Sequence, residues 1–190
     1  MLADSPVRAF DHAVASAALD ALPLTPVNRA LCDYWLSLWK SGALPHRKDF
    51  VPSKVRDALP GIMIMEIKKG AYVRIRLAGT AISQVFGRDV TGEDMIALSP
   101  EAERAGRLER NAFTADGAAT LTMRQADARL GGVKTSQELQ LPFADITPDG
   151  ARLVLFHTSW RPATFEPGVP DVYNTLEHPT GWQAIALWRE

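Results

Sequence analysis

The sequence has little cysteine and no long apolar run, and each scarcity excludes a class of protein. Its single cysteine, Cys32, rules out an internal disulfide and any zinc site that needs two thiolates. No stretch reaches the roughly 18 uncharged apolar residues that a membrane-spanning helix requires. The N-terminus has no basic start followed by an apolar core, because Asp4, Arg8 and Asp11 interrupt it. With no secretory signal, the cytoplasm is the expected location.

An excess of charge of one sign is also missing. The 190 residues carry 21 Lys and Arg against 22 Asp and Glu, so the chain as a whole has no attraction for nucleic acid or for a membrane surface. Hydrophobic residues make up 46%, which is typical of globular proteins and unlike disordered chains. The length suits one domain with extensions. We expect an N-terminal helical extension over 1–24, a folded domain over 25–160 and a C-terminal tail over 161–190.

Two amphipathic helices are predicted before the first strand. Thr25 followed by Pro26 is a typical helix start, and the apolar stripe after it predicts a helix over 26–41. Glycine and proline then predict an ordered loop over 44–51 and a short helix over 53–59. The other amphipathic helix is predicted in the N-terminal extension. Its apolar residues recur at steps of three and four and are Val7, Phe10, Val14, Ala17 and Ala21.

Alternating apolar residues predict strands on both sides of a helical block. Strands are expected over 61–67, 71–79, 118–129, 133–143 and 151–160, and helices over 80–86, 93–98 and 101–115. A two-residue turn between the third and fourth strands would put Leu121 and Leu139 on opposite faces, so we expect a three-residue loop with a glycine bulge. The fifth strand is apolar on both faces, which predicts a central position with the N-terminal helices covering its second face. A further strand at 183–188 stays open.

This order of elements is typical of an α+β fold, and short motifs within it carry a family resemblance. The motifs are the helix with Trp35, the segment Leu44-Pro45-His46-Arg47 with Asp49 and Pro52, Leu59-Pro60, Tyr72–Thr80 and Phe86–Gly92. They are similar to motifs of the PAS domain superfamily, specifically a mainly alphaproteobacterial PAS-fold family once catalogued as a domain of unknown function. The resemblance implies a five-stranded antiparallel sheet with a helical block on one face and N-terminal helices on the other. It also implies a small-molecule pocket between sheet and block, and dimerisation through the N-terminal helices.

The resemblance indicates which cofactors to look for. Photosensing relatives hold flavin beside a reactive cysteine in the helical block, and haem-binding relatives use an axial histidine there. This chain has neither residue between 80 and 116, so we expect no flavin adduct and no His-ligated haem. No cofactor is identified, although noncovalent flavin stays open. The four histidines are too far apart for the common metal motifs, so we predict no metal site.

Several polar residues allow two interpretations. His157 follows an apolar strand, and its ring either reaches a pocket or makes structural hydrogen bonds, which we favour. Arg74 and Arg76 either bind an anion or are solvated and paired. A basic stripe that nucleic acid might use is interleaved with glutamates, which favours ion pairs along a helix. Its members are Arg104, Arg107 and Arg110.

The sequence therefore predicts a stand-alone PAS-type sensory module that binds a small apolar or amphipathic molecule and acts through protein association. We predict no catalytic residues, because no nucleophile or phosphate-binding motif occurs. Expected partners are the small molecule, a second copy in a homodimer and an unknown protein. The alternative is a ligand-free adaptor that docks a partner through the N-terminal stripe, Trp182 and Trp188. The predicted ligand residues, which would equally fill a solid core, are Val73, Ile75, Leu77, Phe86, Leu108, Phe113, Leu121, Met123, Leu139, Leu141 and His157.

Overall fold

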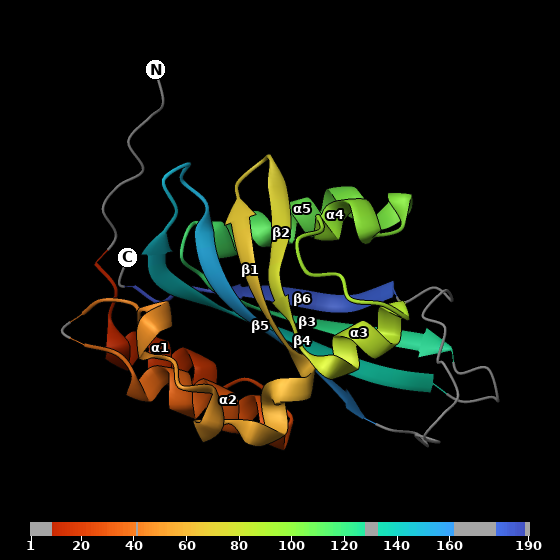
Figure 1. The fold of residues 1–190 in the computed structure, drawn as a ribbon. Helices are drawn as coiled ribbons and strands as arrows, with labels where there is room; N and C mark the ends of the chain where they lie inside the picture. The colour runs from red at the N-terminus through yellow and green to blue at the C-terminus, as the bar shows by residue number, and fades with distance from the viewer. Residues whose placement is uncertain (1–8, 41, 128–132, 162–177, 189–190) are drawn as a thin grey trace.

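A computed structural model of the chain describes residues 9–40, 42–127, 133–161 and 178–188. Within them, a six-stranded antiparallel sheet of order β2-β1-β5-β4-β3-β6 lies between two layers of helices (Figure 1). The strands are β1 (Ile62–Lys68), β2 (Tyr72–Ala78), β3 (Ala119–Asp127), β4 (Val133–Ile146), β5 (Arg152–Arg161) and β6 (His178–Ile185). The helices are α1 (His12–Asp20), α2 (Pro26–Ser37), α3 (Thr80–Phe86), α4 (Met95–Leu98) and α5 (Glu101–Ala115), with 3₁₀ turns η1 (Arg47–Asp49), η2 (Pro52–Lys54) and η3 (Arg56–Gly61).

The sheet has two buried faces, because successive side chains of a strand point to opposite sides. We call the side packed on α1 and α2 the α2 face and the side packed on α3, α4 and α5 the α5 face. The α2 face and its helices form one apolar cluster, which includes Trp35, Ile64, Leu121, Leu139, Leu141, Phe143 and Leu155. The α5 face contributes to a second cluster, which includes Met63, Met65, Ile67, Val73, Ile75, Ile82, Met95, Val154 and Phe156.

The α+β arrangement and both helical layers are as predicted, and the sheet contains one strand more than the expected five. The added strand is β6, which pairs with β3 and brings part of the C-terminal tail into the sheet. Strand β5 is central, between β1 and β4, and α2 contacts it as expected.

The register of β3 and β4 agrees with the predicted faces. Leu121 is paired with Leu139, so both lie on the α2 face. The outermost pair is Asp127 with Val133, which leaves the five residues 128–132 between the strands. The predicted three-residue connection is therefore too short, and the loop itself lies outside the described residues.

The first helix buries a different stripe from the predicted one. Its N-cap is Asp11, whose carboxylate accepts the N–H of Val14 at 3.0 Å. Ala15 and Leu19 are fully buried, whereas Ala17 and Ala21 are exposed. The predicted stripe was wrong because four-residue spacing fits several neighbouring rows in an alanine-rich helix, and packing selects one of them. Phe10 precedes the helix and packs edge-on against Trp188 with ring centroids 6.2 Å apart, while Val7 lies outside the described residues.

Other helix boundaries also differ from the prediction, and α4 begins at Met95 rather than at residue 93. Helix α2 begins at Pro26, capped by Thr25 as expected, and ends at Ser37 rather than at residue 41. The short helix predicted over 53–59 is replaced by η2 and η3, because prolines at both ends favour tight 3₁₀ turns over an α-helix. No helix of the described residues is long and apolar enough to cross a membrane.

Candidate functional site

The eleven predicted ligand residues do not surround one space. Val73 and Ile75 are buried on the α5 face, with Phe86 packed against their cluster. Leu77 and Phe113 are 46% and 42% exposed, and Leu108 on α5 is half-buried. The others lie on the α2 face, on the opposite side of the sheet: Leu121, Met123, Leu139, Leu141 and His157. Alternation marks a buried face without saying which layer covers it, so the sequence could not separate these groups; their binding of a ligand stays a prediction.

His157 belongs to a buried hydrogen-bond network beneath the start of α2. Its Nδ1 donates to Asn28 Oδ1 at 2.5 Å, and the Asn28 amide donates to Ser159 at 3.0 Å and Gln137 at 3.3 Å. Thr25 completes the network, with its N–H bonded to Gln137 and its hydroxyl to Ser159. These bonds attach α2 to β4 and β5. Burial lowers the pKa of His157 to about 4, so its ring is neutral near pH 7.

Gly61 lies against the ring of His157. A Cβ atom at this position would lie 2.9 Å from His157 Nε2 and 2.4 Å from the carbonyl oxygen of Thr158. Glycine is therefore required where η3 runs into β1. Together with the Asn28 contact, this packing gives His157 a structural role.

The α5 face changes from apolar to polar along the sheet. On β1, β2 and β5 it presents side chains such as Met63, Val73 and Phe156. On β3 and β4 it presents the polar residues Thr120, Thr122, Arg124, Ser136, Glu138 and Gln140. The two zones adjoin, because Phe156 of β5 pairs directly with Gln140 of β4. The polar residues that alternate with the apolar ones in β3 and β4 were the signal in the sequence that could have indicated this zone.

Five charged side chains of α5, β3 and β4 meet in the polar zone, and we call them the charge cluster: Glu103, Arg107, Arg110, Arg124 and Glu138. Arg124 lies 2.9 Å from Glu103 Oε2 and 2.8 Å from Glu138 Oε1. Arg107 lies 3.7 Å from Glu103. Burial raises the pKa of Glu138, but the charges of Arg124 and Arg107 outweigh it and the net pKa is lowered. Both glutamates are thus engaged by arginines.

Arg110, a member of the charge cluster, has unused hydrogen-bonding capacity within the described residues. It is 6% exposed, and its Nη2 has no hydrogen-bond partner among the described residues. Its Nη1 lies 3.3 Å from where a Cβ at Gly106 would be, so Gly106 provides the room the guanidinium occupies. Burial, followed by the charges of Arg124 and Arg107, lowers the pKa of Arg110.

Several other polar groups of α5 have hydrogen-bond partners, although Asn111 Oδ1 is buried and has none among the described residues. Thr114 donates to Gln140 at 2.9 Å, and the Asn111 amide donates to the carbonyl of Arg107. Arg104, the first arginine of the predicted basic stripe, bonds to the main-chain carbonyls of Ala97 and Ser99 at the end of α4. The three arginines of that stripe therefore have different surroundings and do not form one solvent-facing row.

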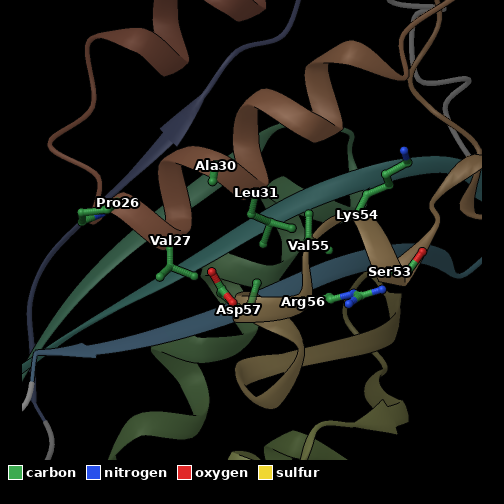
Figure 2. Close-up of a pocket in the computed structure, with 10 residues that line it drawn as sticks. Pro26, Val27, Ala30, Leu31, Ser53, Lys54, Val55, Arg56 and Asp57 are labelled. Atoms are coloured by element: carbon green, nitrogen blue, oxygen red, sulfur yellow. The ribbon is translucent and has the colours of Figure 1, made fainter.

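A groove of about 450 Å³ lies away from the α5 face, between α2 and the segment 53–58 (Figure 2). Across the groove, Val27 and Leu31 from helix α2 lie opposite Val55. Lys54, Arg56 and Asp57 also line it. Its lining combines apolar side chains with charges of both signs.

Metal and thiol chemistry have no support in the described residues. No group of three or more His, Cys, Asp or Glu side chains among them is arranged to hold a metal ion. Burial raises the pKa of Cys32 to about 12, which keeps its thiol protonated and unreactive near neutral pH.

Comparison with known proteins gives one family. A family profile described as "PAS domain" matches residues 24–154. No protein of the curated set matches the sequence.

Three solved structures are similar to the chain. The PAS domain of Bordetella pertussis BvgS is 15% identical, with a TM-score of 0.40 over 54% of this chain and 76% of that one. The Vibrio cholerae VqmA dimer, described as bearing on DNA binding by LuxR-type receptors, is 13% identical, with a TM-score of 0.40 over 59% and 52% of the two chains. An RNA-binding light-oxygen-voltage receptor is 13% identical, with a TM-score of 0.37 over 77% and 47%. The chain spans about half the length of the second and third structures.

Proposed function

The chain belongs to the PAS domain family, and from this premise we propose that it is a sensory module that holds a small amphipathic molecule between α5 and the sheet. The observation that carries the proposal is the division of the α5 face into an apolar zone and a polar zone. A hydrocarbon part would pack on the methionine and aliphatic side chains of β1, β2 and β5. A polar head would lie over β3 and β4, where hydrogen-bonding groups are already buried.

The proposal narrows the kind of ligand. A purely apolar molecule would leave the charge cluster facing hydrocarbon, and burying polar groups against an apolar surface is costly. A fully polar molecule would have no hydrocarbon part to pack on the apolar zone. An amphipathic molecule satisfies both zones at once. We further propose that the response to the ligand passes to other proteins through association, in a homodimer or with a separate partner, in the cytoplasm.

Native mass spectrometry of the full chain, purified without denaturation, tests the ligand. We expect a bound small molecule that is lost on unfolding. The variant Thr122→Phe puts a ring into the polar zone, since Thr122 is 2% exposed on the α5 face, and should abolish retention. Gln183→Phe is the matched control, because Gln183 is exposed on the neighbouring strand β6, and should retain the molecule. A wild-type chain that is always ligand-free and takes up nothing from a total lipid and metabolite extract would refute the proposal.

The second candidate is a ligand-free adaptor, and the groove beside α2 is the observation that favours it. Ala30→Glu would put a charge into that groove without touching the α5 face. If the chain is an adaptor, native mass spectrometry shows protein complexes without small molecules, and Ala30→Glu weakens them. Thr122→Phe would leave such complexes intact.

A further inference from the structure

We infer that the molecule held on the α5 face carries a single carboxylate and that the guanidinium of Arg110 binds it. The inference rests on the proposed function and names the head group of its ligand. It assigns to Arg110 a role that neither the helix pattern nor the family indicates.

Arg110 is buried, and part of its guanidinium is left unsatisfied by the described residues. A buried polar group normally has a hydrogen-bond partner, and a buried charge is normally paired, because leaving either unsatisfied costs free energy. Arg110 is 6% exposed, yet its Nη2 is buried and has no partner within the described residues. Burial lowers the pKa of Arg110, and Arg124 and Arg107 add repulsion that exceeds the attraction of Glu138 and Glu103. An anion placed against Arg110 would relieve both costs.

The charge cluster carries more positive than negative groups. Both glutamates form ion pairs with arginines other than Arg110. Glu103 lies 2.9 Å from Arg124 and 3.7 Å from Arg107, and Glu138 lies 2.8 Å from Arg124. Within the charge cluster, three positive groups face two negative ones. One negative charge balances them, which fits a carboxylate better than a phosphate dianion. A guanidinium also matches the two oxygens of a carboxylate in a bidentate pair.

The guanidinium of Arg110 lies back over Gly106, which fixes it toward the N-terminal half of α5. One helical turn further on, Thr114 bonds to Gln140, and Gln140 is paired with Phe156 at the border of the apolar zone. A hydrocarbon chain extending from a carboxylate at Arg110 therefore reaches the apolar zone by following α5 across the strands.

Isothermal titration calorimetry on the full chain tests the inference with octanoate and, as the uncharged probe, 1-octanol. We expect octanoate to bind the wild type and to bind Arg110→Gln about tenfold or more weakly, as for loss of a hydrogen bond between charged groups. Arg104→Gln is the control, because Arg104 is exposed on the same helix and, within the described residues, bonds to main-chain carbonyls. It should bind octanoate with the wild-type Kd. Octanoate affinities of Arg110→Gln and wild type within twofold of each other would overturn the inference, as would an absence of octanoate binding to the wild type.

The outcomes separate the head group from the proposed function. If 1-octanol binds wild type and Arg110→Gln as tightly as octanoate does, the α5 face binds ligands and the carboxylate is wrong. If native mass spectrometry finds a retained molecule without an acidic group, the same conclusion follows. If neither probe binds and the chain is ligand-free, both statements fail.

Stability gives a readout that needs no ligand. Because Arg110 is buried without a full set of partners, Arg110→Gln should melt at or above the wild-type temperature when no ligand is present. A large decrease in melting temperature would mean that Arg110 supports the fold, and it would contradict the inference.

Discussion

The strongest stability prediction concerns His157 and pH. In the folded chain burial lowers the pKa of this histidine from 6.5 to about 4, so the folded state binds its proton more weakly than the unfolded state does. The stabilisation is therefore fully present above pH 6.5 and is lost as the pH falls toward 4. At about 1.4 kcal/mol per pKa unit, acidification across this window should remove about 3 kcal/mol of unfolding free energy.

Urea titrations at several pH values, followed by circular dichroism, measure this loss. His157→Asn is the matched variant, because an asparagine amide can still donate toward Asn28 while carrying no titratable group. We expect the wild type to lose about 3 kcal/mol more than this variant between pH 6.5 and 4. Carboxylates that also titrate at low pH are common to both proteins, so they cancel in the comparison. Parallel profiles for the two proteins would show that protonation of His157 does not oppose folding.

Three further predictions test the packing around the network and the buried thiol. Asn28→Ala removes three hydrogen bonds from the network of His157. At about 1 kcal/mol for each bond, it should lower the free energy of unfolding in urea titrations by about 3 kcal/mol. A decrease below about 1 kcal/mol would show that the network contributes little to stability. Gly61→Ala should destabilise the chain by about 2 kcal/mol or more, because the added Cβ would meet a main-chain oxygen at 2.4 Å. Gly181→Ala is the control, because the space around Gly181 is open, and it should change stability by less than about 0.5 kcal/mol. Equal effects of the two substitutions in the same titrations would refute this prediction. Cys32 should react with iodoacetamide at pH 8 only after unfolding, as mass spectrometry would show, and rapid labelling of the native chain would contradict its burial.

The sequence was most informative where a local rule decides the structure. Thr25 and Pro26 set the start of α2 because a capping hydroxyl and a fixed φ act within one turn. The helix predicted over 101–115 has those bounds in the structure. The central place of β5 followed from its apolar residues on both faces, which only a strand covered on both sides can bury.

The candidate site was less predictable because it depends on contacts between distant elements. Glu103 and Arg107 look like an exposed helical ion pair, and nothing within α5 reveals that Arg124 and Glu138 lie opposite them. The polar alternation around Thr122 was visible in the sequence, but it equally describes a strand with one solvent-facing side. Only the α5 layer over that side makes those residues a buried site.

Strand β6 has a mechanical consequence for the proposed sensor. Its Trp182 packs on Phe113 of α5 with ring centroids 5.4 Å apart, and the chain just beyond it bonds to the residue that caps α1, through Asp11 N–H and the carbonyl of Leu187. Just past the same, C-terminal end of α5, Gly117 lies close to the ring of Phe10. Helix α5 and helix α1 are thus connected by two contacts that bypass the central strands. A shift of α5 would therefore be passed to α1 through these contacts, and from α1 to the apolar cluster that it shares with α2.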